Sequence, residues 1–127
     1  MTSNASVITS FGYRHEAGVP AGADLVVDLR HRLYNPPEDP KVKAAMVAAT
    51  GLEPHVHAYV MDTDGAEEVI AEILAAMDTL RGRVGRPLRV AIGCQGGRHR
   101  SVVIASEVAA ATGATVVHRD VTLPVIR

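Results

Sequence analysis

A thiol, two arginines, a histidine and a serine lie within eight consecutive residues of this sequence. The stretch reads Cys94-Gln95-Gly96-Gly97-Arg98-His99-Arg100-Ser101. Guanidinium groups suit phosphate and carboxylate oxygens because their donors form a fork of matching geometry. Two adjacent glycines let the backbone close around a ligand without Cβ clashes. These residue types predict binding of an anion, foremost a phosphate group.

The sequence on either side of this stretch predicts the elements that position it. Residues 88–93 are largely apolar, as in a buried strand, and residues 101–112 are rich in Ala and Val, as in a helix. The first N–H groups of a helix lack partners within the helix, and the helix dipole adds about half a positive charge there. The sequence therefore predicts an anion-binding strand–loop–helix, with ligand contacts from Cys94 to Ser101.

The remaining elements predict an α/β fold. Strands are expected at residues 6–12, 23–29, 88–93 and 114–121, a third short strand or extended passage within 52–64, and helices at 41–49, 65–82 and 101–112. Alternating strands and helices imply a three-layer, mostly parallel sheet of about four or five strands with helices on both faces. Asp64, with Glu67 three residues later, is expected to cap the longest helix, and Gly82 to end it.

Composition limits the classes of protein to which the chain can belong. Its 127 residues are 47% hydrophobic, which suits one domain over residues 1–127. Thirteen Lys and Arg against fourteen Asp and Glu give a net charge of −1, which argues against a broad nucleic-acid-binding field but allows a local basic pocket. The single cysteine forms no internal disulfide, so a cytoplasmic location is expected. We find no export signal in residues 1–6 and no apolar run of membrane-spanning length.

The spacing Cys-x-x-Gly-x-x-Arg-Ser resembles the phosphate loop of the protein tyrosine phosphatases. In that family a cysteine thiolate attacks phosphorus, which here implies Cys94 as nucleophile, Arg100 as phosphate clamp and Ser101 assisting thiolate departure. The acid would be one of Asp39, Asp62 and Asp120, none of which lies in a recognisable acid loop. Gly93 stands where that family has a histidine. The alternative is that Cys94 is a small buried residue ending a strand.

A second resemblance covers nearly all of residues 7–121. It is carried in order by Ser10-Phe11-Gly12-Tyr13, residues 23–30, Asn35-Pro36, Thr50-Gly51-Leu52, residues 91–94, Gly96-Gly97, His99-Arg100-Ser101 and His118-Arg119-Asp120. Together these residues resemble the C-terminal domain of the RapZ family, the RNase adapter proteins.

The resemblance implies a sensing domain that binds glucosamine-6-phosphate and, in some members, small regulatory RNAs. Members are also named nucleotide-binding because of a separate N-terminal domain with a kinase-like phosphate loop. This sequence holds no Gly-x-x-x-x-Gly-Lys-Ser/Thr. It also departs from the family at Gln95, commonly Thr, at Pro37, commonly His, and in residues 122–127, which lack the lysine-rich tail.

We therefore expect a phosphate-recognising sensor module for a sugar phosphate, with a regulatory or adapter role. A cysteine-dependent phosphatase and an RNA-binding adapter are the alternatives, so enzyme activity stays open. The pocket edge is expected at Gly12, Arg30, Asn35, His118 and Arg119. Arg30 is either a second phosphate clamp or the partner of Asp28 or Asp120.

The expected partner is a phosphorylated small molecule. A protein or RNA partner and a homo-oligomer are left open, and no membrane partner is expected. His55 and His57 lie two residues apart but have no acidic or cysteine companion at ligand spacing. We therefore expect neither a metal site nor a cofactor.

Overall fold

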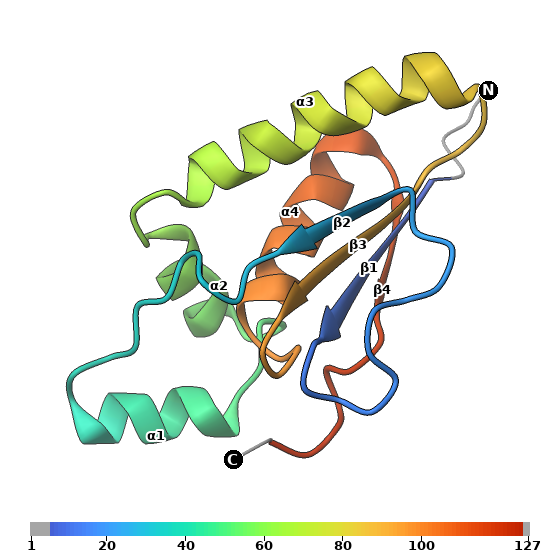
Figure 1. The fold of residues 1–127 in the computed structure, drawn as a ribbon. Coiled ribbons are helices and arrows are strands. Elements are labelled where there is room, and N and C mark those ends of the chain that lie inside the picture. Colours follow the sequence, from blue (N-terminus) through green and yellow to red (C-terminus); the bar gives the residue numbers. More distant parts are fainter. Residues whose placement is uncertain (1–5, 126–127) are drawn as a thin grey trace.

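The computed structural model describes residues 6–125, which form a four-stranded parallel sheet with helices packed against it (Figure 1). The strands are β1 (Val7–Gly12), β2 (Leu25–Asp28), β3 (Arg89–Cys94) and β4 (Thr115–His118), in the spatial order β2-β3-β1-β4. Gly12 pairs with Cys94 and Asp28 with Gly93, so the carboxyl ends of β1, β2 and β3 meet at one edge. Ligands of parallel α/β sheets collect at this edge.

The helices are α1 (Pro40–Ala48), α2 (Pro54–Met61), α3 (Ala66–Val84) and α4 (Arg100–Thr112). Helix α4 packs across β1, β3 and β4, and α2 and α3 pack against α4 (Figure 1). The main core forms between this face of the sheet, with Ile8 and Ile92, and α3, with Ile73 and Met77. No helix of the described residues is long and apolar enough to cross a membrane.

A non-helical segment between β1 and β2, residues 13–24, lies over the opposite face of the sheet (Figure 1). Phe11 and Ala91 on that face are buried, whereas Val26 and Val117 on the two edge strands are 43% and 46% exposed. The predicted α/β class with a parallel sheet of four or five strands is confirmed. Residues 13–24, rather than a helix, therefore cover the second face of the sheet.

The expected strand or extended passage within residues 52–64 is wrong, because residues 54–61 form α2. Pro54 is tolerated there because it occupies the first turn, where its missing N–H would have no partner. Val56 and Val60 lie four residues apart on one helix face and pack against Val103 of α4.

Other predicted element ends also differ, and the strand expected at residues 23–29 covers only Leu25–Asp28. The N-cap of α3 is Gly65 rather than Asp64, and the helix passes Gly82 to end at Gly85, whose φ of 69° suits glycine. The last strand ends at His118 instead of residue 121, because Arg119 and Asp120 form a turn. No export signal is expected in residues 1–6, but residues 1–5 lie outside the described residues. Residues 126 and 127 of the C-terminal tail also lie outside them.

Candidate anion-binding site

Backbone contacts from the end of β1 hold the loop between β3 and α4 in place. The N–H groups of Tyr13 and Arg14 donate to the carbonyl oxygens of Cys94 and Gln95 at 2.9 and 3.1 Å. His15 Nε2 lies 3.0 Å from the carbonyl oxygen of Gly96 and must carry the proton, because a carbonyl oxygen only accepts. These contacts leave the loop little freedom to change its shape.

The same loop presents a run of unused donors. Within residues 6–125, the backbone N–H groups of residues 96–101 donate to no acceptor of the protein. Gly97 has a φ of 74°, a conformation in which successive N–H groups can converge on an anion. The start of α4 adds its dipole at this point. The loop backbone by itself therefore has the chemistry of an anion cradle.

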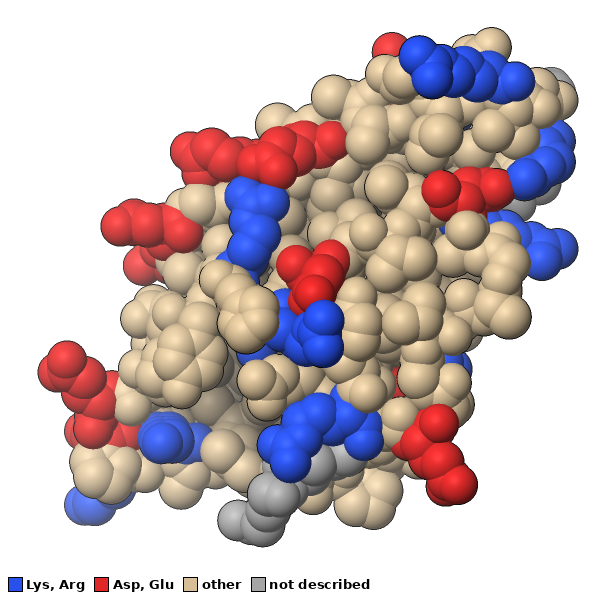
Figure 2. Space-filling model, in the orientation of Figure 1, with Lys and Arg blue, Asp and Glu red and all other residues tan. Residues whose placement is uncertain are grey.

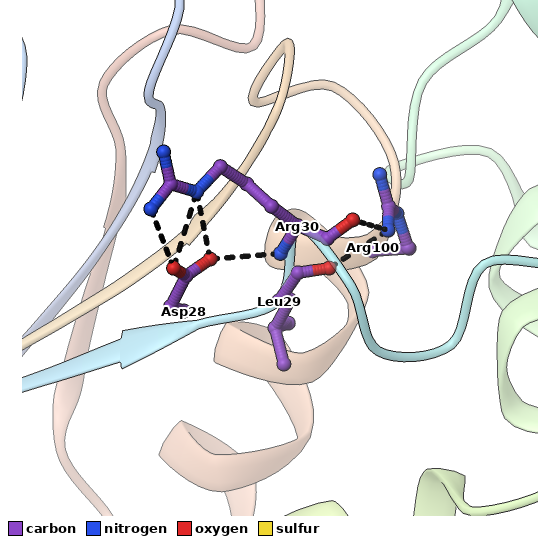
Figure 3. A network of polar contacts seen from close by, with 4 residues as sticks. All are labelled: Asp28, Leu29, Arg30 and Arg100. Carbon is purple, nitrogen blue, oxygen red and sulfur yellow. Dashed lines mark hydrogen bonds and ion pairs between the residues drawn. The ribbon is translucent and has the colours of Figure 1, made fainter.

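Arg100, the first residue of α4, ties the loop to the end of β2 (Figure 3). Its Nη1 donates to the carbonyl oxygens of Leu29, Arg30 and Arg32 at 2.7, 3.3 and 3.1 Å. Its Nη2 and Nε make no hydrogen bond with the described residues. One nitrogen thus fixes the guanidinium, and two remain available to a ligand.

Arg98 and His99 hold the carboxyl end of α1. His99 Nε2 donates to the carbonyl oxygens of Met46 and Ala49 at 2.6 and 2.8 Å. Arg98 Nη2 donates to those of Val47 and Ala49 at 3.4 and 3.3 Å, and Arg98 Nε is buried without a hydrogen-bond partner. Both side chains therefore satisfy main-chain carbonyls in this structure.

Cys94 lies beneath the loop. It is 3% exposed, and its Sγ is 3.2 Å from the hydroxyl of Ser101, which is fully buried. The Nη1 of Arg100 is engaged with the carbonyls that follow β2. This geometry favours the interpretation of Cys94 as a buried residue at the end of a strand.

Arg30, expected at the pocket edge, pairs with Asp28 (Figure 3). Its Nη2 is 2.7 Å from the Asp28 carboxylate, and its guanidinium lies 3.9 Å from the centre of the Tyr13 ring. Hydrogen bonds from the Arg30 side chain lower the pKa of Asp28. Of the two alternatives for Arg30, the structure shows the ion pair with Asp28.

Arg119 and Gly12, two further residues expected at the edge, meet at Asp120. Burial raises the pKa of this carboxyl group, but hydrogen bonds from the Arg119 side chain and the Gly12 N–H outweigh burial and leave the pKa lowered. Arg119 Nη2 and Gly12 N each lie 2.8 Å from Oδ2 of Asp120. Asp120 therefore anchors the end of β1 beside the loop.

His118 points towards α4. Its Nδ1 is 2.7 Å from the hydroxyl of Ser10 in β1, and its Nε2 is 3.2 Å from that of Ser106 in α4. Burial lowers the pKa of His118, which favours the neutral ring. The structure places this residue between the sheet and α4 rather than beside Arg100.

A pocket of about 190 Å³ opens beside the start of α4. Asn35 lines it together with His99 and Arg100, and so do Lys43 and Tyr59, which sequence reasoning missed. The missed residues come from α1 and α2, and no local motif marks them as neighbours of the loop. On the face drawn in Figure 2, basic side chains lie over the carboxyl ends of the strands, and acidic ones over the start of α3.

Comparison with known proteins identifies a family. The sequence profile described as the RapZ C-terminal domain matches residues 5–122. A nucleotide-binding protein of Streptomyces coelicolor is 40% identical over 91% of this chain and 39% of its own length. Nucleotide-binding proteins of Sphingopyxis alaskensis and Geotalea daltonii are each 42% identical over 80% of this chain, and over 31% and 34% of their own lengths. This chain thus spans about two fifths or less of these relatives.

Proposed function

The chain belongs to the RapZ C-terminal domain family, and we propose that it is a phosphate-recognising binding module with a regulatory or adapter role. The observation that carries the proposal is the run of N–H groups from residue 96 to 101 that donate to no protein acceptor within the described chain. Arg100 adds two unused guanidinium nitrogens beside this run. Donors of both kinds suit the oxygens of a phosphate group.

The expected affinity is that of a metabolite sensor. Three charge-assisted hydrogen bonds contribute about 1.5–3 kcal/mol each, and association costs at least about 4 kcal/mol. The remainder is at most about 5 kcal/mol, which corresponds to a dissociation constant of about 0.2 mM or weaker, and contacts to the organic part of the ligand would tighten it. A protein with such an affinity can respond to changes in ligand concentration and pass its occupancy to a partner.

A sugar phosphate is the ligand class that the family resemblance indicates, so glucosamine-6-phosphate is the first compound to test. The relatives are named nucleotide-binding proteins, which makes AMP a second compound. This chain carries no Gly-x-x-x-x-Gly-Lys-Ser/Thr sequence, and the loop between β3 and α4 is the site at which we test AMP.

Calorimetric titration with inorganic phosphate, glucosamine-6-phosphate and AMP tests the proposal. We expect millimolar or tighter binding to the wild type and about tenfold weaker binding to Arg100→Gln, since one charged contact is worth about 1.5 kcal/mol or more. Arg83→Gln, an exposed change on α3, is the matched control and should bind like the wild type. No binding of any of the three compounds at millimolar concentration would refute the proposal.

A further inference from the structure

The pocket beside the loop has mainly apolar walls. Leu33 and Pro37 from the segment after β2, Met46 and Val47 from α1, and Val60 from α2 line it. Two tyrosines, Tyr34 and Tyr59, also line it. Walls of this kind stabilise a ligand through the apolar surface that they remove from water.

Several polar groups of the pocket are already hydrogen-bonded to the protein. Asn35 Nδ2 donates to the hydroxyl of Thr63 at 3.3 Å, and that hydroxyl donates to the carbonyl oxygen of Tyr59 at 3.0 Å. His99 Nε2 donates to carbonyl oxygens of the α1 end. These groups are therefore engaged by the protein itself, and the walls between them are apolar.

Positive charge lies at the same pocket. Arg100 lines it, and its guanidinium carbon is 5.7 Å from the centre of the Tyr34 ring. Lys43 of α1 contributes a second cationic side chain. The pocket therefore combines apolar walls with groups that attract an anion, and Arg100 connects it directly to the loop.

The volume of the pocket matches that of a small ring. A dry protein cavity of about 150 Å³ accommodates one benzene molecule. A pocket of about 190 Å³ that is open to solvent on one side has room for one six-membered ring with a small substituent.

We propose that this pocket binds the organic part of the phosphate ligand, and that this part is a single ring with apolar faces, as in an aryl phosphate. The inference rests on the proposed function, because a phosphate at the loop would place its organic group beside Arg100. It also deepens that function, since it predicts that this chain prefers an apolar ring to an amino sugar. Pro37 adds an apolar ring to the same wall.

Titrations with inorganic phosphate, phenyl phosphate and glucosamine-6-phosphate test the inference. We expect the wild type to bind phenyl phosphate about tenfold more tightly than either of the other two, a difference of about 1.4 kcal/mol. Val47→Phe should fill the pocket and abolish this preference. Val42→Phe is the matched control, because Val42 lies on the same helix, is 45% exposed and does not line the pocket.

A second pair of variants keeps the test decisive if Val47→Phe fails to fold. Tyr34→Ala, which removes a pocket wall that is 72% exposed, should reduce the preference for phenyl phosphate over inorganic phosphate several-fold, whereas Lys41→Ala, outside the pocket, should not. Tighter binding of glucosamine-6-phosphate, or equal binding of phenyl phosphate and inorganic phosphate, would overturn the inference and leave the proposed function intact. If none of the three compounds bound, both would fall.

Discussion

Gly12 and Gly97 pack backbone against backbone at the carboxyl edge of the sheet. A Cβ atom on Gly97 would lie 2.6 Å from the Gly12 nitrogen, and one on Gly12 would lie 2.8 Å from the Gly97 nitrogen. Both distances are shorter than a van der Waals contact between carbon and nitrogen. The neighbouring atoms belong to the backbone, so they cannot move aside as a flexible side chain could. The shape of the loop therefore depends on the absence of side chains at both positions.

Gly97→Ala should lower the free energy of unfolding by at least about 2 kcal/mol. The positive φ costs about 1–2 kcal/mol for a residue with a Cβ, and the clash with Gly12 adds to this cost. Urea unfolding measures the change. Gly96→Ala is the control, because a Cβ there would have no neighbour within 4 Å. Equal urea midpoints for the two variants would contradict this account of the loop.

Asp120→Asn should make the free energy of unfolding depend less on pH in the acid range. The pKa of this carboxyl group is lower in the folded chain than its ordinary value of 3.8, so its stabilisation is present above about pH 4 and is lost as the pH falls further. At neutral pH the variant should be less stable by about 1.5–3 kcal/mol, because charged hydrogen bonds are weakened. Unfolding curves from pH 7 down to about pH 2 should show the two proteins converging. A constant difference would mean that the carboxylate does not titrate with folding.

His99→Ala should destabilise α1 without destabilising α4. This helix has no buried residue, and His99 donates to two carbonyl oxygens at its carboxyl end. Loss of bonds worth about 1 kcal/mol each should speed amide exchange across α1 about tenfold or more, while α4 stays protected. His57→Ala serves as the control, since His57 pairs with Glu107 at 3.3 Å and joins α2 to α4. Unchanged exchange in α1 would show that other contacts hold this helix.

The sequence predicted the strand–loop–helix because its signals are local. Apolar residues lead into Cys94, two glycines follow, and an Ala/Val-rich helix begins directly afterwards. The ion pair of Arg30 with Asp28 was one of the two alternatives for the same reason, since the residues lie two positions apart. The residues that contact a ligand remain a prediction.

The hydrogen-bond partners of the loop's basic side chains could not be predicted from the sequence. Arg98, His99 and Arg100 each meet carbonyl groups about fifty to seventy positions earlier in the chain, and Arg98 also meets those of Val121 and Leu123. A basic residue type shows that a donor exists, but it does not show whether a phosphate or a main-chain carbonyl accepts. The α2 segment posed a related difficulty, because Val56 and Val60 fit both an extended and a helical pattern until Val103 is placed beside them.

Cys94 should resist thiol reagents in the folded protein. Its side chain is 3% exposed, so a disulfide reagent can reach it only when the structure opens. We expect labelling of the native chain to be at least a hundredfold slower than labelling in denaturant, and no hydrolysis of a generic aryl phosphate. Cys94→Ser should bind phosphate like the wild type, because the proposed ligand contacts come from the loop backbone and Arg100. Fast labelling at neutral pH, together with phosphatase turnover that Cys94→Ser abolishes, would instead support the cysteine phosphatase hypothesis. The loop between β3 and α4 would then carry a catalytic residue.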